Sequence, residues 1–188
     1  FQSVKSAPVS ISTFKTAQED MTGMTVIDGH VYTSSDDQSV SCFTLHGQLV
    51  RRFTGHNGGV WAFQVYGDYL ATGSTDKTVR IWSTKTGGVL RIPRAHRCTV
   101  RALTVAGDYL ASASRDRTVG LCDLDGGAPF RRLQGHEGWV LAVVVHAGRR
   151  VVAAGGRAAP LRLCVDATRA AIRVPAGPAA GVAVRAGA

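Results

Sequence analysis

The stretches GSTDKTVRIW (73–82) and SASRDRTVGLC (112–122) are two copies of one pattern. Each has small residues before a polar turn that contains an aspartate, followed by a Thr-Val pair and apolar residues. Weaker copies, TSSDDQSVSCF (33–43) and AGGRAAPLRLC (154–164), stand on either side of them. The pattern therefore occurs four times in this chain of 188 residues.

The copies follow one another at a nearly constant spacing. The turn aspartates Asp37, Asp76 and Asp116 are separated by two almost equal intervals. Histidines recur at the same spacing, at His56, His96 and His136. A fixed period of roughly 40 residues indicates a stacked repeat architecture.

Each repeat alternates short apolar runs with turn residues, as in VWAFQV (60–65), YLATGS (69–74) and TVRIWS (78–83). This rhythm is typical of the short strands of a propeller blade and not of a helical repeat. The chain is similar to WD-repeat proteins. Closed propellers have about 4–8 blades of roughly 40–45 residues each. We therefore expect an all-β fold, an incomplete WD-repeat β-propeller of about four blades, the last of them degenerate.

The domain organisation follows from the repeat positions. We expect an entry strand or linker over 1–16, a partial propeller over 17–175 and a loosely ordered Ala/Gly-rich tail over 176–188. The predicted blades are 17–54, 55–94, 95–134 and 135–175. The number of repeats, and a first residue that is not Met, predict a fragment or a degenerate relative of a longer propeller protein.

The net charge of +9 is unevenly distributed. Residues 149–188 contain seven Arg and a single acid, Asp166, so this stretch carries +6 of the total. Basic tails are usually solvated, and we expect no specific nucleic-acid partner. Contact with RNA through this tail is an alternative, which predicts an affinity that falls steeply with salt.

Cysteine usage favours reduced thiols. Cys42, Cys98, Cys122 and Cys164 form no CxxC pair and no metal-ligand spacing, so we expect no metal and no cofactor. Three of them lie at or beside the position of Trp82 in its repeat and are predicted to be small buried apolar residues. The sequence shows no signal peptide and no apolar run of about 18 residues, so we expect no membrane partner and a nuclear or cytoplasmic location.

One set of polar residues recurs at fixed offsets. Its members are His56, Thr72, Asp76 and Trp82 in the second repeat, His96, Ser112 and Asp116 in the third, and His136 in the fourth. A Ser-His-Asp set suggests catalysis, but its recurrence from repeat to repeat favours a structural role, and we predict no catalytic residue and no enzyme. The set resembles the structural network of WD-repeat blades, in which an indole N–H, a hydroxyl, a histidine and the turn aspartate are joined by hydrogen bonds. Pairing of this kind is required of buried polar groups.

Two kinds of loop emerge on one face of a propeller: those that lead into the first strand of a blade, and the turns between its second and third strands. At these positions the sequence supplies Trp61, Thr75, Lys77, Thr99, Arg101, Arg115 and Leu141. Clustered guanidinium groups suit a phosphate or a carboxylate because their planar fork makes bidentate, charge-assisted hydrogen bonds.

A narrower resemblance is carried by GHNGGVWAFQV (55–65), LATGSTDKTVRIW (70–82), AHRCTVRAL (95–103), LASASRDRTVGLCD (110–123) and GHEGWVLAVVVHAGRRVV (135–152). These stretches resemble consecutive blades of the F-box/WD-repeat substrate receptors of SCF-type ubiquitin ligases, of the cell-division-control type. The resemblance covers roughly residues 17–165.

This resemblance implies a reader of phosphorylated Ser/Thr-Pro segments, with phosphorylated proteins and ubiquitin-ligase subunits as partners. Arg101 and Arg115 would hold the phosphate. The remaining peptide contacts would come from Trp61, Thr75, Lys77 and Thr99. Leu141 stands where a further arginine is expected, and the chain contains no F-box-like helical stretch.

Two other functions remain open on the sequence. One is a general WD-repeat scaffold for protein assembly without selectivity for phosphate, and the other is an inactive remnant. The Arg101–Arg115 pair discriminates between a scaffold and a phosphopeptide receptor, because a scaffold does not require it.

Overall fold

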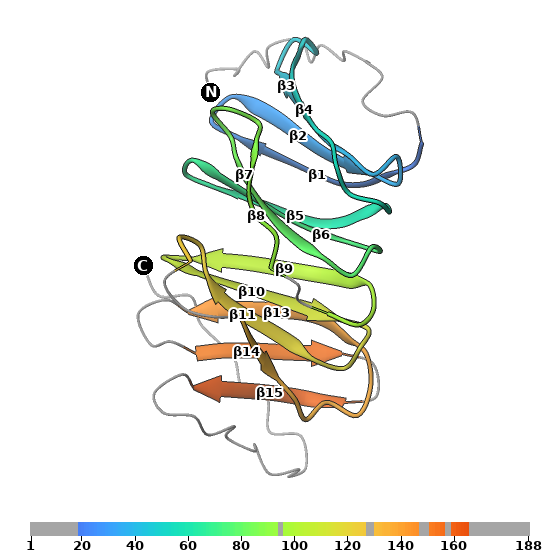
Figure 1. Ribbon diagram of the computed structural model, residues 1–188, viewed down its shortest axis with the longest axis vertical. Coiled ribbons are helices and arrows are strands. Elements are labelled where there is room, and N and C mark those ends of the chain that lie inside the picture. The colour runs from blue at the N-terminus through green and yellow to red at the C-terminus, as the bar shows by residue number, and fades with distance from the viewer. Residues whose placement is uncertain (1–18, 94–95, 127–129, 147–150, 157–158, 166–188) are drawn as a thin grey trace, which may run out of the picture. The chain divides into compact units, whose positions relative to one another are not determined.

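The computed structural model describes residues 19–93, 96–126, 130–146, 151–156 and 159–165. The regular structure of these residues consists of fifteen β-strands in four antiparallel sheets (Figure 1). The chain forms two compact units, Phe1–Arg94 and Ala95–Ala188, and each is described by itself. The predicted linker at 1–16 and tail at 176–188 lie outside the described residues.

The first unit contains two four-stranded sheets. The strands of one are β1 (Met21–Ile27), β2 (His30–Ser35), β3 (Val40–Thr44) and β4 (Leu49–Phe53). Those of the other are β5 (Val60–Tyr66), β6 (Tyr69–Ser74), β7 (Val79–Ser83) and β8 (Val89–Arg91). In both sheets each strand pairs with the next one along the chain, which is the meander order of a propeller blade.

The second unit repeats this arrangement. Its first sheet holds β9 (Val100–Ala106), β10 (Tyr109–Ser114), β11 (Val119–Asp123) and β12 (Arg131–Leu133). Its second sheet holds β13 (Val140–His146), β14 (Val151–Gly156) and β15 (Ala159–Val165). The degenerate fourth repeat thus forms a three-stranded sheet within the described residues.

Tight turns join the strands because the residues at them accept a left-handed backbone. Asp28 and Gly29, between β1 and β2, have φ values of 49° and 71°. Two consecutive positive φ values define the type I′ turn, whose twist matches that of a two-stranded hairpin, and Asp-Gly is a favoured pair for it.

The core of each unit lies where its two sheets pack together. In the first unit, buried side chains of one sheet (Tyr32, Val40, Phe53) form one cluster with those of the other (Val60, Leu70, Trp82). In the second unit, Val119 and Leu121 cluster with Val140 and Val143 in the same way. Because a blade buries its apolar face only against a neighbour, the sheets are stabilised in pairs.

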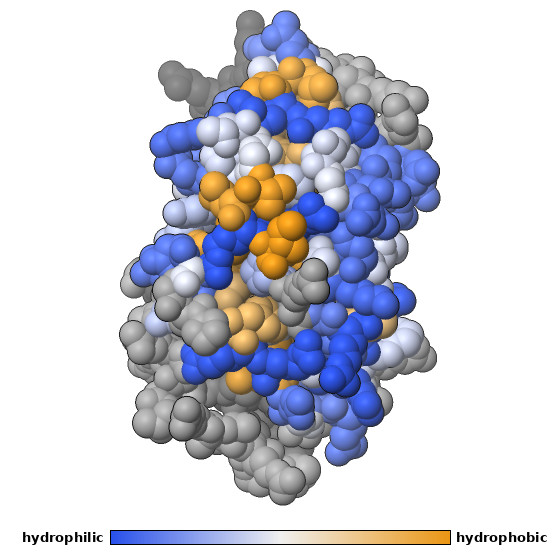
Figure 2. All heavy atoms as spheres, viewed as in Figure 1, coloured by the Kyte–Doolittle hydropathy of each residue, from blue (hydrophilic) through white to orange (hydrophobic). Residues whose placement is uncertain are grey.

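Apolar side chains also reach the surface among hydrophilic ones (Figure 2). Among the described residues of the first unit, the most exposed large apolar side chains are on β1, where Met24 and Val26 are 61% and 59% exposed. In the second unit Val144 of β13 is 63% exposed. The described part of the chain contains no helix of the length and hydropathy needed to cross a bilayer.

Candidate functional site

The turns between the second and third strands of the blades are built around an aspartate. In the turn between β6 and β7, Oδ1 of Asp76 accepts hydrogen bonds from the backbone N–H (2.9 Å) and the hydroxyl (2.7 Å) of Thr78. Lys77 at the tip has φ = 73°. Asp116 and Thr118 make the same pair of bonds at 3.0 and 2.6 Å, with Arg117 at φ = 69°. The side chains of Lys77 and Arg117 are exposed.

The structure brings together the four predicted network residues of the second blade. The indole N–H of Trp82 donates to the Thr72 hydroxyl at 2.8 Å, and this hydroxyl lies 2.7 Å from Nε2 of His56. Nδ1 of His56 lies 2.7 Å from Oδ2 of Asp76. With its proton on Nδ1, His56 donates to Asp76 and accepts from Thr72, so every group in the chain has a partner. The network holds the turn against the loop before β5.

The third blade forms the same bonds without a tryptophan. Nε2 of His96 lies 2.8 Å from the Ser112 hydroxyl, and Nδ1 lies 3.1 Å from Oδ2 of Asp116. Cys122 takes the position of Trp82 and is buried. The ring of Phe130 packs edge-on against His96, with centroids 6.0 Å apart, as Trp82 does against His56. Phe130 thus replaces the lost indole from a different strand position, which the sequence did not indicate.

The first and fourth blades depart from the network. In the first blade Arg52 pairs with Asp37 at 2.5 Å and donates to the Ser39 hydroxyl at 3.0 Å. Arg52 therefore contacts the turn aspartate that a histidine contacts in the second and third blades. In the fourth, His136 is buried, but Ala154 stands where Thr72 and Ser112 carry a hydroxyl.

The network perturbs the ionisation of its members. Burial opposes ionisation of Asp76, but hydrogen bonds from His56 and Thr78 outweigh it and hold the pKa of this carboxyl below its usual value. Burial also opposes ionisation of Asp116, but hydrogen bonds from Thr118 and from the backbone N–H of Arg97 lower the pKa of this carboxyl. Burial lowers the pKa of His96 despite the opposite effect of the Asp116 carboxylate.

These pKa shifts predict that acid lowers the stability of the folded protein in two stages. Because the pKa of folded His96 is below its unfolded value of about 6.5, the unfolded state takes up a proton first and stability falls below that pH. Because the pKa values of folded Asp76 and Asp116 are depressed, their contribution is complete above about pH 4 and is lost as these carboxyls protonate. Thermal unfolding followed by circular dichroism from pH 8 to pH 3 measures both stages.

Matched variants separate the two stages. His96→Gln is expected to reduce the fall between pH 7 and pH 5, and Asp76→Asn the fall below pH 4. Parallel pH profiles of the wild type and of both variants would contradict the assignment.

In the first unit the candidate binding residues lie on β5 and on the turn after β6. Trp61 is partly exposed, and Thr75 is exposed beside Lys77. The backbone N–H of Thr75 donates to the Gly59 carbonyl at 3.0 Å, which joins the turn to the loop before β5. A Cβ on Gly58 would lie 2.3 Å from the Thr75 hydroxyl. This close approach explains the first glycine of GHNGGVW, and the second is explained by Asp36, whose Oδ1 would lie 2.1 Å from a Cβ on Gly59.

In the second unit Arg101, on β9, lies close enough to Arg115 for their charges to interact. The pKa of Arg101 is lowered, first by burial and then by the Arg115 guanidinium. The backbone N–H of Arg115 donates to the backbone carbonyl of Thr99 at 3.1 Å, so Thr99 contacts the turn through its backbone. Leu141, in place of the expected arginine, is 40% exposed.

Trp139 is a residue of this site that sequence reasoning missed. The guanidinium carbon of Arg115 lies 4.7 Å from the centroid of its ring, and the side chain is 43% exposed. Its repeat position is that of Gly59 and Thr99, immediately before the first strand of a blade. An aromatic residue at a position where the second and third repeats have small ones was the available signal.

No group of three His, Cys, Asp or Glu side chains in the described part of the chain is placed to share a metal ion. The described cysteines, Cys42, Cys98 and Cys122, are free, and Cys42 and Cys122 are buried. Burial raises the pKa of the Cys42 thiol. Cys42 and Cys122 thus lie in the core, as predicted for the cysteines at or beside the position of Trp82, and the third of these, Cys164, has a side chain outside the described part of the chain.

Comparison with protein families gives two matches to the WD domain, G-beta repeat, at residues 47–83 and 87–123. These two segments are WD repeats. Each runs from the end of one blade to the third strand of the next, and WD repeats form domains that bind protein partners.

The WD repeats of this chain have curated relatives of several kinds. The chain is 35% identical over 71 residues to Cell division control protein 4 of Saccharomyces cerevisiae, a match that covers 37% of this chain and 9% of that protein. It is 45% identical over 53 residues to WD repeat-containing protein pop1 of Schizosaccharomyces pombe, covering 28% of this chain and 7% of pop1. It is 33% identical over 69 residues to Eukaryotic translation initiation factor 3 subunit I of Aspergillus oryzae, covering 35% of this chain and 21% of that subunit. The matches thus span about a fifth or less of each relative.

Two solved structures share the fold. The computationally designed Ika4 protein superposes with a TM-score of 0.75 at 23% identity, covering 81% of this chain and 95% of Ika4. The designed Ika8 protein gives a TM-score of 0.73 at 24% identity, covering 78% of this chain and 46% of Ika8. Together with the WD repeats, this likeness confirms the prediction of an all-β, incomplete WD-repeat propeller.

Proposed function

We propose that this chain is a substrate-recognition domain of an SCF-type ubiquitin ligase, which binds phosphorylated Ser/Thr-Pro segments of nuclear or cytoplasmic proteins. The observation that carries the proposal is the cluster of Arg101, Arg115 and Trp139 in the second unit. Similarity to Cell division control protein 4 supports the same assignment.

The cluster is suited to a phosphate for two physical reasons. The Arg115 guanidinium lies over the Trp139 ring, with its carbon 4.7 Å from the ring centroid, where a cation is attracted to the π system. Stacking leaves the N–H edge of a guanidinium available, and a phosphate binds along that edge with two parallel hydrogen bonds. The pKa of Arg101 is lowered by burial and by Arg115, and a bound dianion would relieve the repulsion between the two cations.

The exposed face of Trp139 suits the proline of the same segment. The proline ring restricts its own backbone and favours an extended segment, and aromatic rings are the usual surface against which such segments pack. The two arginines would thus select the phosphate, and the indole would select the residue that follows the phosphorylated position.

Titration with a fluorescent phosphothreonine-proline peptide and its unphosphorylated twin tests the proposal. In Arg101→Glu/Arg115→Glu the affinity for the phosphopeptide is expected to fall at least about a hundredfold, because charge-assisted hydrogen bonds are worth about 1.5–3 kcal/mol each. In Trp139→Leu it is expected to fall about three- to tenfold, the value of a cation–π contact.

The matched control is Lys85→Glu/Arg131→Glu, which makes the same change in net charge at two exposed side chains. Its affinity is expected to match that of the wild type. Equal binding of both peptides, or an equal loss in the control, would contradict phosphate recognition at this cluster.

Similarity to Eukaryotic translation initiation factor 3 subunit I favours a second candidate function, a scaffold in a protein assembly without phosphate selectivity. A scaffold would be unaffected by charge reversal at Arg101 and Arg115. The same titration therefore separates the two functions.

A further inference from the structure

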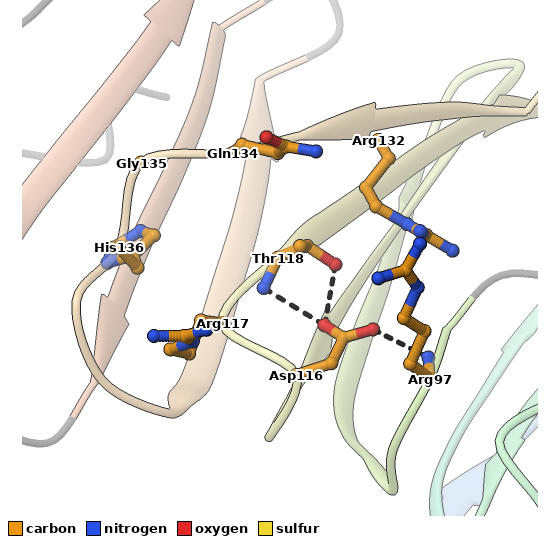
Figure 3. Close-up of a pocket in the computed structure, with 8 residues that line it drawn as sticks. All are labelled: Arg97, Asp116, Arg117, Thr118, Arg132, Gln134, Gly135 and His136. Carbon is orange, nitrogen blue, oxygen red and sulfur yellow. Dashed lines mark hydrogen bonds between the residues drawn. The ribbon is translucent and has the colours of Figure 1, made fainter.

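A second basic site lies in the second unit, away from the ring of Trp139. It is a pocket of about 290 Å³ (Figure 3). Its lining residues are Arg97, Asp116, Arg117, Thr118, Arg132, Gln134, Gly135 and His136. Neither Arg101 nor Arg115 is among them.

Three guanidinium groups reach this pocket from three separate elements. Arg97 precedes β9, Arg117 is at the tip of the turn between β10 and β11, and Arg132 is on β12. Figure 3 shows the guanidinium groups of Arg97 and Arg132 directed toward one another, and Arg117 beside His136. Like charges repel at such close range, so a bound anion would stabilise this arrangement.

The acidic residue of the lining is already engaged. Asp116 accepts hydrogen bonds from the Thr118 hydroxyl (2.6 Å) and from the backbone N–H groups of Thr118 (3.0 Å) and Arg97 (2.7 Å). Its second oxygen also lies 3.1 Å from Nδ1 of His96. The carboxylate therefore accepts its hydrogen bonds from the turn, from the loop before β9 and from His96.

The second blade shows that two of these arginines are not needed to build the fold. At the positions of Arg97 and Arg132 it has Asn57 and Ile92, one repeat earlier in the chain. It nevertheless forms the same bonds among histidine, aspartate and hydroxyl. The second blade thus forms this network without either arginine, whereas in the first blade Arg52, at the position of Arg132, pairs with the turn aspartate that His96 contacts in the third.

We propose that the pocket lined by Arg97, Arg117 and Arg132 binds an oxyanion of the phosphate class. Arg97 and Arg132 grip the anion from one side and Arg117 from the other. The Gln134 amide supplies a further N–H donor at the rim. A phosphate occupies only part of 290 Å³, so the pocket also has room for a small organic group esterified to it. This site does not depend on the function proposed for Arg101 and Arg115.

Titration of the full chain with inorganic phosphate, followed by 31P NMR at constant ionic strength, tests this site. The titration is made in an Arg101→Gln/Arg115→Gln background, which removes the other cluster, and this protein is expected to bind phosphate with a dissociation constant of about 1 mM. Arg97→Asn/Arg132→Ile, which copies the second blade, is expected to weaken it at least about tenfold, the equivalent of one charge-assisted hydrogen bond. A parallel titration with phenyl phosphate shows whether the pocket prefers the free anion or its ester.

The matched control is Lys85→Gln/Arg131→Gln, which removes the same charge at two exposed side chains outside both clusters and is expected to leave phosphate affinity unchanged. An equal affinity of the pocket variant and the control, or no saturable binding by the Arg101→Gln/Arg115→Gln protein, would overturn the proposal. If the pocket variant does not fold, the wild-type spectrum decides. Phosphate is then expected to shift the side-chain N–H signals of Arg97, Arg117 and Gln134, and unshifted signals would overturn the proposal.

Discussion

Replacing Asp76 by alanine is expected to lower the free energy of unfolding by about 3–5 kcal/mol. The Asp76 side chain is 7% exposed and accepts hydrogen bonds from His56, from the Asn57 N–H and from two donors of Thr78. Alanine would leave these donors in a buried position without an acceptor. Urea unfolding followed by tryptophan fluorescence measures the loss, since Trp82 is buried in the same network.

The control for this prediction is Asp68→Ala. Asp68 also pairs with a cation, Lys85 at 2.6 Å, but the two side chains are 61% and 72% exposed. Solvent screens an exposed ion pair, so its loss is expected to cost no more than about 1 kcal/mol. Equal losses in the two variants would show that burial of the network contributes nothing to stability.

Replacing Gly120 by alanine is expected to destabilise the second unit by about 1–3 kcal/mol, the usual cost of overpacking. A Cβ at this position would lie 2.1 Å from Cζ of Phe130 and 2.7 Å from the Ser112 hydroxyl. Phe130 packs on His96, and Ser112 is bonded to it, so the new methyl group would push apart two partners of the same histidine. Hydrogen exchange of residues 96–126 measures the effect within this unit.

Gly155→Ala is the matched control, because a Cβ on Gly155 of β14 would meet nothing within 4 Å. It is expected to leave exchange in the second unit unchanged. The double variant Gly120→Ala/Phe130→Leu, with the leucine that the second blade has at position 90, is expected to recover part of the loss. Equal protection in Gly120→Ala and Gly155→Ala would contradict the packing role of Phe130.

The repeat period made much of the fold predictable. A turn aspartate and a histidine at constant spacing define one repeat. Each repeat folds as a meander, whose contacts join residues close in sequence. The bonds among His56, Thr72 and Asp76 involve residues at most 20 positions apart, so the recurring offsets identified the set, and the resemblance to WD-repeat blades implied how its members are bonded.

Contacts that replace a missing residue were not predictable in this way. Phe130 packs on His96 where the second blade uses Trp82, and Arg52 pairs with Asp37 where that blade uses His56. Both replacements come from the fourth strand of a blade or the residue before it, whose side chains have no fixed partner in the repeat pattern. Which of them reaches the network depends on the space that small residues such as Gly120 leave open.

The sequence by itself determined the all-β blades, their number and the polar set that holds the turn in the second and third blades, because these depend on local periodicity and on residues at fixed offsets. Only the tertiary structure decided which basic side chains meet. Arg115 lies over Trp139 because neighbouring sheets pack and bring together loops from consecutive repeats. Arg97, Arg117 and Arg132 line one pocket because a loop, a turn and the fourth strand of one blade meet there. Long side chains on turns carry no periodic signal, so their convergence depends on that packing.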